Sequence, residues 1–166
     1  VPARPAPPVG AIAIGHPGPT GEGTASRGKA APQNSWATGT AANVNSIYRR
    51  LVAVRPEFDG RVANTAQGGA KAFQLATQAT AALQDVPTPA LVILSTIDND
   101  IACDGTDAAT MPGFGASVTQ AFAVITAAAP NAQHLRVGHG VRHTTNFSNA
   151  HGTPHPRAQS AHTGTG

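Results

Sequence analysis

Charged and aromatic residues are scarce in this 166-residue sequence, at 11% and 4%. A typical soluble domain has about 25% charged residues. The formal net charge of +3 therefore reflects few acids rather than many bases. No cluster of Lys and Arg interleaved with aromatic residues occurs, so a nucleic-acid-binding function is not expected. With so few aromatic side chains, the core must be built mainly from Ala, Val, Ile and Leu.

Cysteine and long apolar runs are also nearly absent. The single cysteine, Cys103, cannot form an internal disulfide, so it is either a small buried hydrophobic residue or half of a bridge whose partner lies beyond residue 166. No apolar run reaches the length that a membrane-spanning helix needs. Residues 1–8, a proline-rich leader, lack the apolar segment of a signal peptide. They look like the start of a processed, secreted chain; a disordered cytosolic start is the alternative.

Acidic residues are missing from the last third of the chain, because none follows Asp107. Residues 139–166 are rich in His, Thr, Gly and Pro and are expected to form an irregular tail, which leaves the C-terminal part of the fold incomplete. Two pairs of histidines are spaced four apart there: His139 and His143, and His151 and His155. The intervening Gly and Pro argue against a helix that would align them, so we expect neither a metal site nor a cofactor.

Between residues 9 and 138, short apolar runs alternate with Ala-rich segments. The runs predict strands at residues 11–14, 61–64, 91–95 and 134–137. The segments predict helices that end at residue 54 and that span residues 71–84 and 114–129. This alternation is typical of a three-layer α/β sandwich with a central parallel sheet, here of flavodoxin-like topology.

Helical spacing also predicts which side chains face the core. Asn43 or Ser46 is expected to cap the first helix. The inward residues are expected to be Val44, Ile47, Leu51 and Val54 in the first helix, and Phe73, Ala76 and Leu83 in the second.

A glycine-rich loop follows the first strand, in the sequence VGAIAIGHPGPTGEG at residues 9–23. It resembles the first sequence block of the SGNH (GDSL-type) hydrolases, where a strand ends in Gly-Asp-Ser and continues as x-x-x-Gly-x-Gly. Gly15 stands at the first Gly of that block, and Gly21 and Gly23 continue the pattern. His16 and Pro17 stand in the Asp and Ser places. Pro17 has neither a nucleophilic atom nor a backbone N–H to donate.

Two later stretches extend the resemblance. In the sequence NTAQGGA, Gly69 matches the glycine whose N–H helps to form the oxyanion hole in that family; a plain turn is the alternative interpretation. In TIDND, Asn99 matches the side-chain donor to the oxyanion and Asp100 the residue that holds the loop, with Ile97 in place of the family's Gly. A solvated turn or a cation site is the alternative there, although the loop lacks the Gly and Glu of a calcium-binding EF-hand.

The resemblance covers residues 9–138 and implies a carboxylic-ester hydrolase that acts on acyl esters or acetylated sugars. The family's closing Asp-x-x-His, which supplies the general base, has no counterpart because the last acid is Asp107. We therefore expect impaired hydrolysis from the sequence as printed. Two alternatives remain open: a non-catalytic binding domain on the same fold, and a truncated or altered form of an active esterase in which a serine would stand at position 17.

Overall fold

The computed structural model describes residues 7–16 and 18–138. Its centre is an all-parallel sheet with the strand order β2-β1-β3-β4. The strands are β1 (Ala11–Gly15), β2 (Val62–Asn64), β3 (Leu91–Ser95) and β4 (Gln133–Val137). This is the flavodoxin-type order of doubly wound sheets. The predicted strands are confirmed to within one residue at each end.

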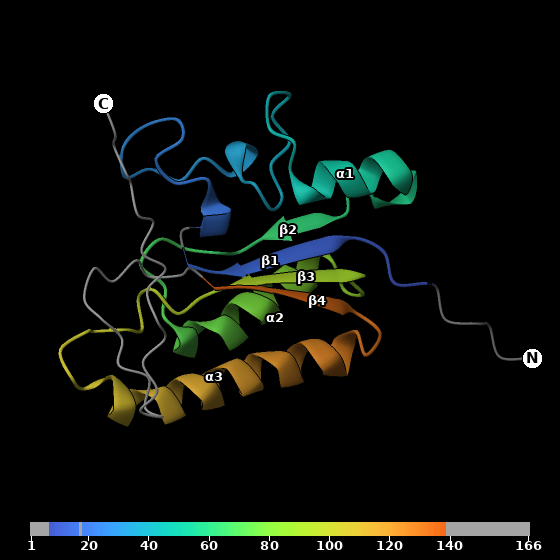
Figure 1. The fold of residues 1–166 in the computed structure, drawn as a ribbon. Coiled ribbons are helices and arrows are strands. Elements are labelled where there is room, and N and C mark those ends of the chain that lie inside the picture. The colour runs from blue at the N-terminus through green and yellow to red at the C-terminus, as the bar shows by residue number, and fades with distance from the viewer. Residues whose placement is uncertain (1–6, 17, 139–166) are drawn as a thin grey trace, which may run out of the picture.

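Helices cover both faces of the sheet (Figure 1). Helix α1 (Ile47–Val54) lies on one face, and α2 (Leu75–Asp85) and α3 (Asp107–Ala128) lie on the other. The predicted three-layer α/β sandwich is therefore confirmed. The loops that follow β1, β2 and β3 gather at one end of the sheet, at the left in Figure 1.

The core consists of small and branched aliphatic side chains, as the composition predicts. Ile12 and Ile14 of β1 face α2 and α3, where they pack with Val92 and Leu94 of β3. The alternate residue Ala13 faces the other side and packs in a smaller cluster with Ile93, Ala37 and Trp36. Both faces of the two central strands are thus buried, which is why their sequences are apolar throughout.

The predicted inward face of α1 is partly wrong. Ser46 caps the helix, since its hydroxyl accepts a hydrogen bond from the Arg49 N–H at 3.1 Å. Val54, however, is 76% exposed, and the buried residue of the helix is Tyr48. The Tyr48 hydroxyl donates to the Phe58 carbonyl at 3.2 Å and accepts from the Gly60 N–H at 2.8 Å. These contacts fix the rotation of the short helix.

The predicted face of α2 is also wrong at its start. A 3₁₀ turn (Ala72–Gln74) precedes the helix, and Phe73 on that turn is 70% exposed. Ala76 and Leu83 are only half-buried. The buried residues of α2 are Leu75, Gln78, Ala79 and Ala82. An Ala-rich helix has little contrast between its faces, so its packing against the sheet and α3 decides which side is buried.

Helix α3 begins at Asp107, seven residues before its predicted start at residue 114. The Asp107 carboxylate accepts hydrogen bonds from the N–H groups of Ala102 (2.7 Å) and Cys103 (3.1 Å), so the acid both begins the helix and closes the loop before it. Cys103 is exposed, so the first of its two predicted roles, a small buried hydrophobic residue, is wrong.

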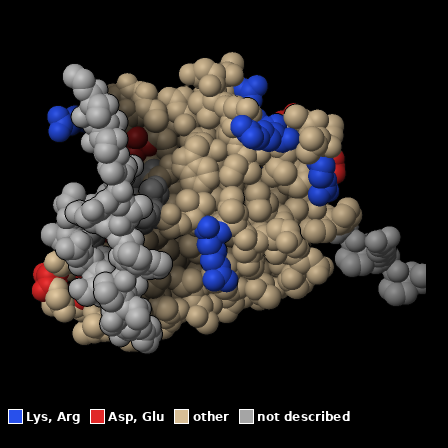
Figure 2. Space-filling model, viewed as in Figure 1, with Lys and Arg blue, Asp and Glu red and all other residues tan. Residues whose placement is uncertain are grey.

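Charged side chains are few on the described part of the face seen in Figure 2. None of the helices within residues 7–16 and 18–138 is long and apolar enough to cross a membrane. The predicted leader at residues 1–8 lies almost wholly outside the described residues. Pro17 and the predicted tail at residues 139–166 lie outside them entirely.

Candidate active site

Gly15, the last residue of β1, is held in a conformation that requires glycine. Its φ is +122°, and a Cβ on it would lie 1.7 Å from the Ser95 carbonyl oxygen. The Gly15 carbonyl accepts a hydrogen bond from the Gln67 N–H at 3.0 Å. The end of β1 is therefore in direct contact with the end of β3 and with the loop after β2.

The turn at Gly15 is also tied to α2 by Gln78, a residue that the sequence pattern did not identify. The buried Gln78 side chain accepts from the Gly15 N–H at 2.6 Å and donates to its carbonyl at 3.2 Å. This pair of bonds resembles the pairing of two strands and fixes the direction in which the chain leaves β1. A polar residue three positions after Leu75, on the side of α2 that faces the sheet, is the signal that could have identified it.

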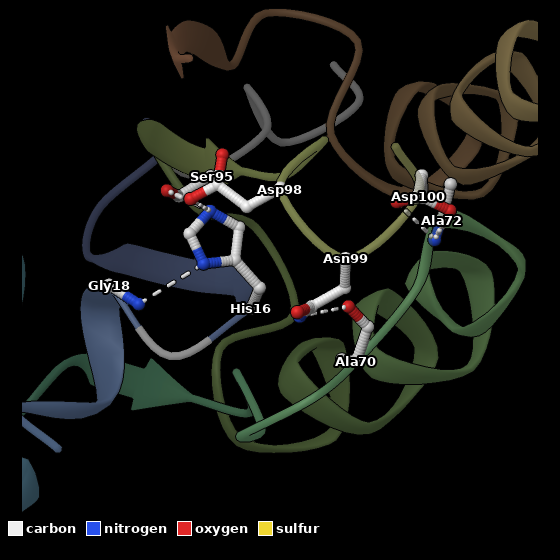
Figure 3. A network of polar contacts seen from close by, with 8 residues as sticks. All are labelled: His16, Gly18, Ala70, Ala72, Ser95, Asp98, Asn99 and Asp100. Carbon is white, nitrogen blue, oxygen red and sulfur yellow. Dashed lines mark hydrogen bonds and ion pairs between the residues drawn. The ribbon is translucent and has the colours of Figure 1, made fainter. Parts of the chain in front are cut away.

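His16 is 3% exposed and lies in a polar cluster with the buried Ser95 and the exposed Asp98 (Figure 3). Its Nε2 lies 3.2 Å from the Ser95 hydroxyl and 3.8 Å from an Asp98 carboxylate oxygen. On the other side of the ring, the Gly18 N–H donates to Nδ1 at 3.3 Å. Because Nδ1 accepts, the neutral ring carries its proton on Nε2.

This tautomer determines what the cluster can do chemically. An Nε2 that carries a proton cannot take one from Ser95, and the Ser95 hydroxyl is fully buried, away from any substrate. The arrangement of Ser, His and Asp is thus not a catalytic triad. It holds the loop after β1 against the end of β3, on either side of position 17.

Asn99, one of the two predicted oxyanion donors, is bonded to the residue that follows the other, Gly69. The Asn99 side-chain amide donates to the Ala70 carbonyl at 2.9 Å (Figure 3). Asp100 accepts from the Ala72 N–H at 3.0 and 3.2 Å, through its two carboxylate oxygens. The loop after β3 is in this way bonded to the segment between β2 and α2.

Ile97 has a φ of +113°, which is rare for a β-branched residue. This is the position at which the resembled family has Gly. The Ile97 carbonyl accepts from the N–H groups of Asp100 (2.9 Å) and Ile101 (3.2 Å), so the strained residue starts the turn that presents Asn99. Strain of this kind is concentrated at functional loops.

Two hollows border these loops. One, of about 510 Å³, is lined by Gly18, Glu22, Asn34 and Trp36 together with further glycines of the loop after β1. The other, of about 400 Å³, lies between the residues that follow β2 and the start of α2. Both have the size of small-molecule pockets.

The carboxylates of the acidic loop accept hydrogen bonds within the described residues. No group of three or more His, Cys, Asp or Glu side chains that could hold a metal occurs among those residues. The Thr106 hydroxyl and N–H both donate to Asp104, and these bonds hold the pKa of Asp104 below its usual value.

A scan against protein-family models and a search of curated proteins find no match for this chain. Its function is therefore inferred from the sequence blocks and the site geometry alone.

Proposed function

We propose that this chain is a carboxylic-ester hydrolase of the SGNH type, whose site binds the carbonyl group of an acyl ester at the carboxyl edge of the sheet. The hydrogen bond between Asn99 and the Ala70 carbonyl is the observation that supports the proposal, because it holds a side-chain amide against the residue that follows Gly69. Two N–H donors that converge on one point are what an oxyanion hole requires. An amide NH₂ has two hydrogens, and the bond to Ala70 uses one of them.

The nucleophile of the proposed reaction would stand at residue 17, in the loop that follows β1 at the carboxyl edge of the sheet. Residue 17 lies between His16 and Gly18, and both of these are bonded into the loop after β1. A serine there would attack the ester carbonyl while Gly69 and Asn99 stabilise the oxyanion. Pro17 cannot perform this attack, and no acid follows Asp107 to orient a C-terminal histidine base. The site of the printed chain therefore binds an ester but hydrolyses it slowly.

The test restores the nucleophile and supplies the base from solution. Hydrolysis of p-nitrophenyl acetate is measured for Pro17→Ser and for the matched control Pro17→Ala, each with added imidazole as general base. We expect the serine variant to exceed the alanine variant by at least about 10-fold. Adding Asn99→Ala to the serine variant should remove most of this gain, since an oxyanion donor contributes about 10²–10³ in rate.

Equal rates for the serine and alanine variants would overturn the proposal. If the higher hydrolysis rate of Pro17→Ser does not fall when Asn99→Ala is added, Asn99 is not the oxyanion donor. The non-catalytic alternative, favoured by Pro17 itself, predicts saturable binding of a non-hydrolysable ester analogue without any gain in hydrolysis from Pro17→Ser.

A further inference from the structure

We infer that the hollow of about 400 Å³ between the end of β2 and the start of α2 binds a neutral carbohydrate. It is lined on one side by Asn64, Thr65, Ala66 and Gln67, and on the other by residues of the 3₁₀ turn and α2, including Phe73, Gln74 and Thr77. Pockets of this size hold ligands of one or a few rings.

The lining chemistry selects the class of ligand. No lining residue carries a charge, whereas amide and hydroxyl side chains are numerous. An ionised ligand would lose hydration without gaining a counter-charge, and a purely apolar one would leave the amides without partners. A neutral ligand with many hydroxyl groups satisfies both conditions, because each hydroxyl both donates and accepts.

Part of the lining is a rigid wall. The Asn64 amide donates to the Pro19 carbonyl and to the Thr38 hydroxyl, both at 2.7 Å, and its oxygen accepts from the Ala66 N–H. Gln78 is committed to Gly15. These bonds hold the hollow open before any ligand arrives, which reduces the entropy cost of binding.

Other groups of the lining are exposed and can reach a ligand. Within the part of the chain that the structure describes, the side chains of Gln67 and Thr77 make no hydrogen bond, and both residues are exposed. Gln74 accepts from the Lys71 N–H at 2.9 Å through its oxygen, a bond that does not use its NH₂ group. Donors and acceptors are thus presented from both sides.

Phe73 supplies the apolar surface that a sugar ring needs. Its side chain is 70% exposed, although burial of a phenylalanine is favourable by about 1.5–3 kcal/mol. An aromatic face beside amide groups suits the apolar face of a sugar ring, whose edges carry the hydroxyls. The exposed ring of Phe73 is therefore available to pack against the apolar face of a bound sugar.

Gln67, which lines the hollow, stands two residues before Gly69 in the sequence. A sugar held there would contact Gln67, whose N–H donates to the Gly15 carbonyl at the end of β1. The carbohydrate would be the alcohol part of an acetylated substrate, a role that rests on the proposed function. The binding of the carbohydrate does not rest on it.

The test measures binding to the chain as printed, without hydrolysis. ¹H–¹⁵N NMR titrations use cellobiose as the neutral probe, glucuronate as the charged one and cyclohexanol as the apolar one. We expect saturable shifts of amides in residues 64–81 with cellobiose, with a Kd in about the millimolar range. Phe73→Ala should weaken binding by about 5-fold, the range of a single aromatic contact. Val54→Ala, which removes another exposed apolar side chain on α1, should leave it unchanged.

Absence of saturable shifts, tighter binding of glucuronate or cyclohexanol, or equal affinity of Phe73→Ala and the unsubstituted chain would each overturn the inference. Because cellobiose binding needs no residue 17, its failure leaves the esterase proposal untouched. Conversely, cellobiose binding beside an inactive Pro17→Ser variant would remove the esterase proposal and keep the carbohydrate site.

Discussion

Two positions of the site, Gly15 and Ile97, have a backbone conformation that favours glycine. At Gly15, a side chain would collide with the Ser95 carbonyl, so glycine is required by contact as well as by φ. At Ile97, the φ of +113° is equally unfavourable for a side chain, yet isoleucine stands there. The backbone at Ile97 thus has a conformation that glycine adopts without strain and isoleucine does not.

Replacing Ile97 with glycine should therefore stabilise the protein. A residue held in a sparsely populated conformation costs about 1–3 kcal/mol. Ile97 is only half-buried, so less contact is lost than strain is relieved. We expect the free energy of unfolding to rise by about 1 kcal/mol in Ile97→Gly, measured by urea denaturation. Ile97→Ala keeps the strained Cβ and loses the contacts, so it should destabilise; a gain in Ile97→Ala equal to that in Ile97→Gly would contradict the strain at this position.

At the scale of elements, single side chains join α2 to β1 and β4 to α3. Gln78 joins the helix to the Gly15 turn. His134 of β4 stacks on Phe122 of α3 at 4.8 Å between ring centroids, and Arg136 lies 4.5 Å above the same ring. These contacts give β4 a partner on α3, although most of its side chains are exposed.

Removing the Gln78 amide should destabilise the fold. In Gln78→Leu, the Gly15 N–H loses its hydrogen-bond partner in a buried place, which costs about 1–3 kcal/mol. Gln84→Leu is the matched control, since Gln84 lies on the exposed side of the same helix and should change stability by less than about 0.5 kcal/mol. Urea denaturation of both variants measures the difference. Equal stabilities would show that the Gln78 contacts contribute nothing.

His134 should make stability depend on pH. Burial, and then the positive charge of Arg136, lower the pKa of His134 below its usual value of 6.5. The unfolded chain therefore takes up a proton more readily than the folded one. Stability should be full above about pH 6.5 and should fall as the pH is lowered through that value, until the folded protein is protonated too.

The measurement is the free energy of unfolding of the unsubstituted chain and of His134→Gln at about pH 7.5 and pH 5.5. We expect a smaller loss on acidification in the variant, because the ionisable group is gone. The same loss in both proteins would assign the pH dependence to other groups.

For the whole molecule, the proposed ester-binding site lacks a nucleophile, because Pro17 stands in the place of the serine. We expect turnover of a short-chain p-nitrophenyl ester below about 1 s⁻¹, the low end of ordinary enzymes. Binding and oxyanion donors without a triad leave only about 10³-fold over water. Turnover above that limit, abolished by a serine-directed phosphonate that labels one serine, would contradict this interpretation of Pro17.

The layers of the fold were determined by the sequence itself. A strand buried on both faces must be apolar throughout, and such runs stand out at residues 11–14 and 91–95, while parallel strands require helical crossovers between them. The same reasoning predicts that the residues after β2 and β3, and with them Gly69 and Asn99, lie at one edge of the sheet.

Only the tertiary structure decided the rotation of the helices and the contacts within the site. Alanines occupy much of α2, so packing decided that Gln78 faces inward, and it left Phe73 of the preceding 3₁₀ turn exposed. The pairing of His16 with Ser95 joins residues 79 positions apart in the chain. Hydropathy and spacing report which residues avoid water, whereas a hydrogen bond between distant loops depends on where the packed elements place their ends.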